Sequence, residues 1–192
     1  TSLVGSAATT DKITDIATGV DMSPITNTGI EVLDLADGGV SLTIDAANLT
    51  NVTTLTGGSA ADTLVLAEAA AFNLNAVTTF SGLETINMAA SGKVATSIAI
   101  TESGSNDFAG ALTGANGTAQ TLTLASSTDA DISIVGITNT EIETITLADD
   151  GDDLTIDTAN LTNVTAINGV NGGNAEFVIT NAAEAYDFKA IT

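Results

Sequence analysis

The sequence predicts an all-β protein, more specifically a parallel β-solenoid built from internal repeats. The first reason is a duplication, because residues 25–57 return at residues 137–169 without a gap, with 22 identities in 33 aligned positions. The second is that strand-like segments recur about every ten residues, with clusters of Gly, Asn, Asp and Ser between them. The third is that hydrophobic residues make up 44% of the chain but aromatic residues only 3%, which suits thin aliphatic layers. Repeats of this kind stack on one another and bury a shared core.

Ten segments with alternating apolar and polar residues are expected to form strands. They are residues 31–35, 41–44, 62–66, 84–88, 96–100, 121–124, 131–135, 143–147, 154–156 and 176–179. Helical patterning is weak, and only residues 11–18 and 66–71 are expected to supply about one helical turn each.

A shorter unit recurs inside the long repeat. Glu31, Glu84 and Glu143 each introduce an expected strand, and they lie 53 and 59 positions apart, which together make the offset of 112. The sequence therefore predicts a cap or the end of a preceding unit in residues 1–24. Residues 25–136 then form a first copy of two diverged units, and residues 137–192 form a partial second copy.

The differences between the two copies predict which side chains face the core. Where apolar residues differ, size is kept, as for Leu33 against Ile145, whereas Gly38 becomes Asp150. Changes of equal volume are tolerated in a core, and turns face solvent. The expected inward positions are Leu33, Leu35, Leu42, Ile44, Leu49 and Val52.

Two architectures fit these patterns. One is a solenoid with one or two strands in each coil of about 20 residues, in which like residues stack along the axis. The Asn- and Thr-rich runs at 48–53 and 160–165 suit the ladders of such stacks. The alternative is a pair of tandem β-sandwich domains. A sandwich usually buries a Trp or Tyr, and because the chain has no Trp and one Tyr, the solenoid is favoured.

The charge of the chain restricts its partners. Three Lys and no Arg face 24 acidic residues, for a formal net charge of −21. Nucleic acids and anionic lipids both need cationic contacts, so neither is an expected partner. The same charge opposes a compact fold by self-repulsion, and divalent cations or high salt are the simplest means to offset it.

The absence of Cys and His narrows the chemistry further. It removes Cys nucleophiles, thiolate zinc sites, the commonest general base and the usual transition-metal ligands. No apolar run approaches the ~20 residues that a membrane-spanning helix needs, so membrane insertion is not expected.

A first candidate calcium site lies in residues 57–65. This segment matches the nonapeptide GGxGxDxUx at Gly57, Gly58 and Asp62 and at its apolar position. In that repeat, turn carbonyls and Asp carboxylates hold Ca²⁺ between successive coils. Ala60 replaces the third glycine and no tandem copy follows, so the segment offers about half a site. The other interpretation is a glycine-rich turn with no ion.

A second candidate calcium site is an acidic turn in the second copy. Calcium takes six to eight oxygen ligands, and carboxylates around a glycine turn could supply them. The candidate ligands are Asp149, Asp150, Asp152, Asp153 and Asp157, and the matched turn of the first copy keeps Asp37 and Asp45. The other interpretation is a solvated turn on a charged surface.

In these segments the chain resembles a known group of proteins. The Gly-Ile-Glu strand starts, the Leu-Thr-Ile-Asp strands and the segment 57–65 are similar to bacterial surface-layer proteins and large adhesins of the RTX type, exported by type I secretion. The resemblance covers residues 11–180 in the general pattern of the sequence and residues 57–65 in a specific motif. It implies an extracellular, calcium-supported, β-rich protein that assembles on or between cells.

These observations lead to three functional expectations. The first is a structural protein that assembles with copies of itself into a surface layer, sheath or fibre on the bacterial cell surface, with Ca²⁺ as the ion and cell-surface glycan as a possible further partner. The second is a spacer in the stalk of a large adhesin. The third, a polysaccharide-acting β-helix enzyme, is disfavoured, because three Lys and no Arg offer little to grip sugars and no catalytic residues stand out.

Overall fold

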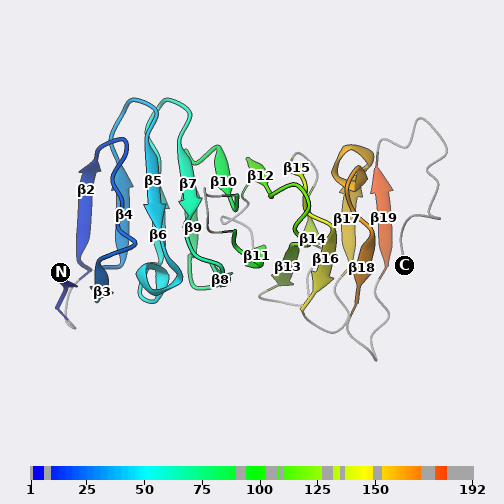
Figure 1. Ribbon diagram of the computed structural model, residues 1–192, viewed down its shortest axis with the longest axis horizontal. Helices are drawn as coiled ribbons and strands as arrows, with labels where there is room; N and C mark the ends of the chain where they lie inside the picture. Colours follow the sequence, from blue (N-terminus) through cyan, green and yellow to red (C-terminus); the bar gives the residue numbers. More distant parts are fainter. Residues whose placement is uncertain are drawn as a thin grey trace.

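A computed structural model of the chain describes residues 2–6, 10–89, 94–102, 108, 110–126, 132–134, 137–148, 153–169 and 176–180. These residues form an elongated β-solenoid whose strands run side by side along its length (Figure 1). Neighbouring strands of the described sheets all pair in parallel. The predicted solenoid is confirmed, and the sandwich alternative is excluded because it requires antiparallel sheets.

The strands gather into five sheets. Sheet 1 contains β5 (Ser41–Ile44), β7 (Thr63–Leu66), β10 (Thr85–Asn87), β12 (Ala111–Thr113) and β15 (Thr138–Thr140). Sheet 2 contains β8 (Ala71–Asn73), β11 (Ser97–Glu102), β13 (Thr121–Ser126), β16 (Thr144–Leu147) and β18 (Ala166–Asn168). Sheet 3 contains β2 (Lys12–Ile16), β4 (Val32–Leu35), β6 (Thr54–Thr56) and β9 (Thr79–Ser81). Sheet 4 contains β14 (Ile132–Ser133), β17 (Leu154–Asp157) and β19 (Phe177–Thr180), and sheet 5 contains β1 (Ser2–Val4) and β3 (Thr26–Thr28).

The coil has three sides. Side 1 is sheet 1, continued by the 3-10 helix η2 (Thr158–Leu161), which contacts β15. Side 2 joins sheet 5 to sheet 2 through the 3-10 helix η1 (Ala46–Leu49), which contacts both β3 and β8. Sheets 3 and 4 together form the remaining side of the coil, which we call side 3. Within the described residues, helices are limited to these two short segments, and none could cross a bilayer.

Each turn passes through three strand positions, not the one or two that the sequence predicted. Between β13 and β16, which are neighbours in sheet 2, the chain forms β14 and β15 on the other two sides. Paired residues of successive turns are separated by 20 positions at Lys12 and Val32, and by 27 positions at Ala111 and Thr138. Three positions fit into so few residues because most strands have only three or four residues and short turns join them.

The core consists of aliphatic side chains stacked in register. On side 1, Leu42 lies over Leu64, Leu64 over Ile86 and Ile86 over Leu112, and none of the four is more than 1% exposed. On side 2, a matching ladder contains Phe72, Ile98, Leu122 and Ile145. Burial of each such side chain stabilises the fold by roughly 1.5–3 kcal/mol. All six inward positions predicted from the repeat are buried.

The ten expected strands are all present, as β4, β5, β7, β10, β11, β13, β14, β16, β17 and β19. The other nine were missed because most have three residues, too few for an alternating pattern to be recognised. Both helix predictions were wrong. Residues 11–18 contain β2, and in residues 66–71 a turn joins the end of β7 to the start of β8. Propensity over so short a stretch is overridden by pairing with the next turn.

The sequence repeat and the coil are out of phase. Four three-residue strands, β1, β6, β12 and β18, are each followed directly by a glycine, and they occupy equivalent places along the sequence repeat. They lie on sides 2, 3, 1 and 2 in that order. Each unit therefore ends one strand position later around the coil than it began. As a result, the Asn-rich runs at 48–53 and 160–165 lie on different sides and do not stack on each other as the sequence suggested.

We expect Ile86→Ala to destabilise the protein by about 2–5 kcal/mol, because it opens a cavity between Leu64 and Leu112. Thr85→Ala, one residue earlier on the outer face, is the matched control and should cost less than about 1 kcal/mol. Urea unfolding followed by circular dichroism measures both. Equal losses in the two variants would contradict the inward ladder.

Candidate functional site

The most regular local structure of the molecule is a reciprocal pair of hydrogen bonds at its corners. The backbone N–H of Asp62 donates to Oε2 of Glu84, one turn later, at 2.7 Å. In return, the carbonyl of Asp62 accepts the backbone N–H of Glu84 at 3.2 Å. Each residue thus satisfies the other across the gap between two turns. We call this arrangement a corner clasp.

The clasp occurs three times in the described residues. Asp11 pairs with Glu31 in the same way, at 2.8 Å, and Gln120 pairs with Glu143, also at 2.8 Å. The three Glu residues are those whose spacings of 53 and 59 mark the short unit. Because each unit is rotated by one strand position, the three clasps lie at three different corners of the coil.

The first residue of each clasp also caps the turn that precedes it. Asp62 is fully buried, and its Oδ1 accepts the N–H of Val40 at 2.5 Å while its Oδ2 accepts the N–H of Gly58 at 2.6 Å. Asp11 accepts the N–H of Ser6 through Oδ2. A carboxylate that receives two backbone N–H bonds is satisfied without a metal ion, since charge-assisted bonds of this kind are strong.

The third clasp performs the same task with a neutral side chain. Gln120 is fully buried, and its Oε1 accepts the N–H of Ala115 at 2.5 Å, as Asp62 does from Gly58. Its Nε2 donates to the carbonyl of Ala95 at 2.6 Å. An amide can therefore replace the carboxylate, which identifies turn capping as the property that the three positions share.

Glycine is required where each clasp brings two turns together. A Cβ on Gly57 would collide with the carbonyl of Gly82, one on Gly5 with that of Gly29, and one on Gly114 with that of Glu141. Gly29, Gly82 and Glu141 all have a positive φ, of 89°, 62° and 61°. At Glu141 a non-glycine residue adopts this left-handed conformation, which few residue types do readily.

The structure brings together four of the predicted calcium ligands. Gly57, Gly58 and Asp62 lie in the second clasp, and Oδ1 of Asp37, from the preceding turn, accepts the N–H of Ser59 at 3.2 Å. A Cβ on Gly58 would lie 2.8 Å from the Cα of Asp37, so the two backbones are in close contact. At this corner the half-site predicted from the nonapeptide therefore lies beside an acidic residue of the preceding turn.

The other predicted ligands are dispersed. Asp45 and Asp157 begin η1 and η2, where they accept the N–H of Asn48 at 3.0 Å and of Asn160 at 3.1 Å. Asp153 lies at the opposite end of β17 from Asp157 and accepts the N–H of Glu176 at 2.5 Å. Asp149, Asp150 and Asp152 lie outside the described residues. Within the described ranges, no three acidic side chains gather closely enough to hold a metal ion.

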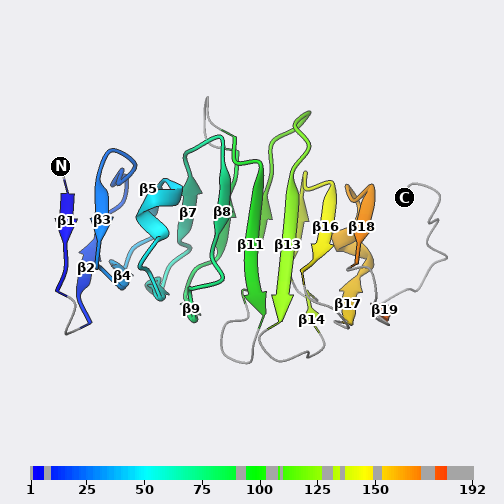
Figure 2. The same ribbon diagram turned by 90° about the horizontal axis from the view of Figure 1, so that it is seen from below.

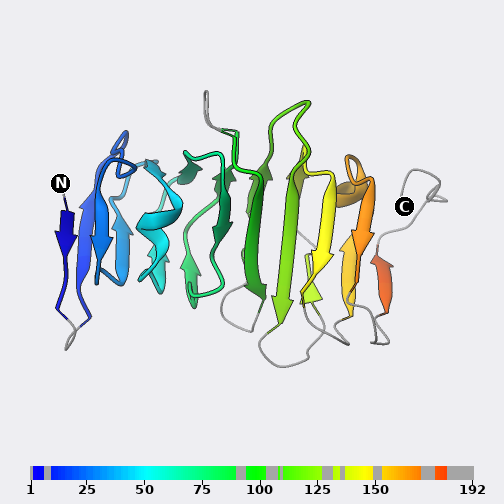
Figure 3. The ribbon, with the colours of Figure 1, turned by 60° about the horizontal axis from the view of Figure 1, so that its bottom comes forward.

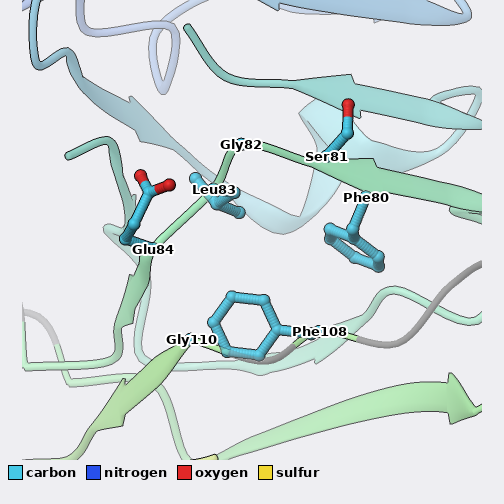
Figure 4. A pocket seen from close by; sticks show the side chains of 7 residues that line it. All are labelled: Phe80, Ser81, Gly82, Leu83, Glu84, Phe108 and Gly110. Atoms are coloured by element: carbon cyan, nitrogen blue, oxygen red, sulfur yellow. The ribbon is translucent and has the colours of Figure 1, made fainter. Parts of the chain in front are cut away.

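A pocket of about 220 Å³ lies beside the second clasp (Figure 4). Phe80 and Phe108 meet there edge to face, with ring centroids 6.2 Å apart and an interplanar angle of 62°. The rings are only 8% and 3% exposed, so neither offers a free face to a ligand. Figure 4 shows the Glu84 carboxylate pointing away from the Phe108 ring. The pocket is therefore a packing feature of the corner.

The charges of the described strands are distributed unevenly over the three sides. Side 3 carries Lys12, Asp15, Asp34 and Asp157 on its strands. Every described outward side chain of sheet 1 and of sheet 2 is instead Thr, Ser, Ala, Asn or Val. In a chain with a net charge of −21, the described outward side chains of sheets 1 and 2 are thus uncharged, and the acidic residue in their strands is Glu102, at the end of β11.

Sequence reasoning missed the clasps themselves, although Asp62 was among the predicted calcium ligands. Glu31, Glu84 and Glu143 were recognised as markers of a period, and Asp11 and Gln120 were not singled out. Their common signal is an Asp or Gln just before a strand and a Glu just before the strand that pairs with it one turn later.

Comparison with known proteins identifies no relative of the chain. No protein-family profile matches the chain, and no curated protein and no solved structure is significantly similar to it.

We expect Gly57→Ala to lower the free energy of unfolding by about 1–3 kcal/mol or more, because its Cβ has no room beside the Gly82 carbonyl. Gly169→Ala is the matched control, since Gly169 holds the equivalent place in the last unit and a Cβ there meets no described atom within 4 Å. Urea titration compares the two. A stable Gly57→Ala protein would contradict the close approach.

We expect Asp62→Ala to destabilise the protein by about 2–5 kcal/mol in the presence of a calcium chelator, because the N–H groups of Val40 and Gly58 lose their acceptor. Asp37→Ala removes an exposed carboxylate from the same corner and should cost less than about 1 kcal/mol. Thermal melts of both variants measure the difference. An effect of Asp62→Ala seen only with Ca²⁺ would instead assign the carboxylate to the ion.

Proposed function

We propose that the protein is an extracellular, non-catalytic structural protein whose copies assemble into a surface layer, sheath or fibre. One observation carries the proposal, namely the separation of charge from two flat sides of a continuous solenoid. The uncharged outer rows of sheets 1 and 2 offer surfaces on which chains can meet, although each copy carries a charge of −21. The resemblance to RTX-type surface proteins supports the same location.

The regular coil supports a mechanical role. Its strands pair in parallel from turn to turn, its core is a set of stacked aliphatic ladders, and clasps join the turns at three corners. In an array of stacked turns, stability is shared between nearest neighbours. Such a rod keeps its shape over its whole length, which is what a lattice subunit requires.

Calcium is part of the proposal because carboxylates of adjacent turns lie beside one another at the corners, although no three of the described ones gather closely enough to hold an ion by themselves. Asp62 and Glu84 belong to adjacent turns, and Asp37 lies in the turn before them. A screening length of about 8 Å at physiological ionic strength leaves such neighbours repelling each other. A divalent cation bound at these corners, or between the corners of two copies, would reduce the repulsion. We propose Asp37, Gly57, Gly58 and Asp62 as the first place for it.

A spacer in an adhesin stalk is the second candidate, and the continuity of the coil favours it. Each unit continues the coil directly from the previous one, and its equivalent strands lie one strand position further around the axis. Units can therefore follow one another without a linker. A stalk needs this rod-like continuity but no contact between chains. Self-association therefore distinguishes the two functions.

We expect the purified protein to form particles much larger than a monomer in millimolar Ca²⁺, and to melt at a higher temperature than in chelator. Light scattering and negative-stain electron microscopy measure assembly. The melting shift follows from binding to the folded state alone, which stabilises it by about 2.7 kcal/mol at a hundredfold excess over Kd.

The control is an equal ionic strength of sodium chloride, which screens charge without specific coordination. A protein that stays monomeric under all conditions would favour the adhesin spacer. Assembly that is equal in sodium and calcium salts would support the structural function but remove calcium from it.

A further inference from the structure

We propose that the outer face of sheet 2 is the surface through which two copies of this chain associate. This inference rests on the proposed structural function and names the contact that it requires. The face is formed by β8, β11, β13, β16 and β18, which lie side by side in Figure 2 and come forward in Figure 3. No register shift is recorded between these strands, so the outward side chains form straight rows.

The net negative charge of the molecule favours contact through a surface that lacks charged side chains. Two chains of net charge −21 repel each other, and the repulsion is strongest where carboxylates would meet. Side 3 presents Asp34 and Asp157 on its strands. The two five-residue rows that run from Ala71 to Ala166 and from Asn73 to Asn168 contain no charged side chain. Glu102 is the last residue of β11, at the end of the strand beyond these rows. Contact there keeps the acidic corners at the rim of the interface.

The rows are also nearly symmetric about the central strand β13. The first row reads Ala, Ser, Thr, Thr, Ala, and consists of Ala71, Ser97, Thr121, Thr144 and Ala166. The second reads Asn, Ala, Thr, Thr, Asn, and consists of Asn73, Ala99, Thr123, Thr146 and Asn168. A two-fold axis requires a surface that is complementary to itself. An axis along β13 would place alanine against alanine at the ends of one row and asparagine against asparagine at the ends of the other.

The two asparagines complement each other in hydrogen bonding. Oδ1 of Asn73 accepts the N–H of Asn75 at 2.9 Å, so its Nδ2 hydrogens are available to a further acceptor. Nδ2 of Asn168 donates to Oγ1 of Thr146 at 3.4 Å, so its Oδ1 is available to a further donor. The proposed axis brings the Nδ2 donor of one copy to the Oδ1 acceptor of the other, at both edges of the face.

Sheet 1 is also uncharged, but it is a poorer surface. Its longest strands have four residues, whereas β11 and β13 at the middle of sheet 2 have six. Its outward asparagine, Asn87, lies on the central strand β10, and the outward residues of its edge strands β5 and β15 are Ser and Thr, so no pair of asparagines would meet across a two-fold axis there. Sheet 2 therefore offers the larger flat area and the better-placed polar groups.

The size of the face predicts a weak pairwise contact. Five strands about 4.8 Å apart, with three to six residues at about 3.3 Å each, cover roughly 24 Å by 10–20 Å. Two such faces bury roughly 500–950 Å² in total, less than the ~1,200 Å² of a stable complex. Isolated dimers should therefore be transient, and the contact becomes effective when an assembly repeats it.

A single-cysteine experiment tests the contact, because the chain contains no Cys and each introduced thiol is its only one. Thr123→Cys places the thiol on the outer side of β13, next to the proposed axis. Thr43→Cys on sheet 1 and Thr56→Cys on sheet 3 are matched controls from outward strand positions. We expect mild oxidation to link Thr123→Cys into dimers at least about tenfold faster than either control, because the thiols are held close together. Equal rates, a faster Thr43→Cys or no dimer from any variant would overturn the proposal.

A charge variant separates this inference from the function on which it rests. We expect Thr123→Asp to abolish assembly in Ca²⁺, whereas Thr56→Asp assembles like the unchanged protein, with melting curves of both variants as the check of folding. If the unchanged protein assembles and Thr123→Asp assembles equally well, the sheet 2 face is wrong while the structural function stands. If the unchanged protein never assembles, the structural function fails, and the cysteine experiment still decides on the contact. Loss of binding to a cell-surface glycan resin in Thr123→Asp, without any effect on cross-linking, would assign the face to glycan.

Discussion

Each turn of this protein must lie on the previous one in parallel register, and the other features of the structure depend on that constraint. Parallel pairing places Leu64 between Leu42 and Ile86 on the inside, and Thr63 between Ser41 and Thr85 on the outside. It also brings the backbones at the corners so close that Gly57 cannot carry a side chain. The corner clasps satisfy the polar groups that this crowding would otherwise leave unpaired, because Asp62 and Glu84 each accept the other's backbone N–H through a carbonyl or a carboxylate. The aliphatic ladders and the clasps are two results of the same stacking.

The repeat of the sequence does not match the repeat of the coil, and this mismatch shapes the surface. Equivalent strands β1, β6, β12 and β18 fall on sides 2, 3, 1 and 2, so a feature that recurs in every unit is distributed around the axis. The clasps accordingly occupy three corners and strengthen the rod on all of them. The outer surface of each side is therefore formed by strands that occupy different places in the repeated unit. The near symmetry of the sheet 2 rows is thus a property of five different strands and does not follow from one repeated motif.

Acidic residues have two distinct uses in this chain. Asp62, Asp45 and Asp157 accept backbone N–H groups at turns and at the starts of 3-10 helices, where a carboxylate is a strong acceptor. Gln120 shows that at the clasp the charge itself is dispensable. The remaining acidic groups give the molecule its net charge and keep the uncharged sides as the places of approach. The proposed structural function, in which copies meet through those sides and cations bind at the corners, would use both groups of acidic residues.

The sequence by itself determined the fold class, ten of the strands and the inward positions, because alternation and turn chemistry are local properties. Leu33, Leu42 and Ile44 were correctly placed in the core from the pattern of substitutions between the two copies. Only the tertiary structure decided where each unit lies around the coil, since that depends on how many strand positions complete one turn. It also decided that Asp62 meets Val40, 22 positions earlier, and that Asp45 and Asp157 start helices on different sides. These contacts join residues of successive turns, and no local periodicity specifies which residue of the next turn will lie above a given one.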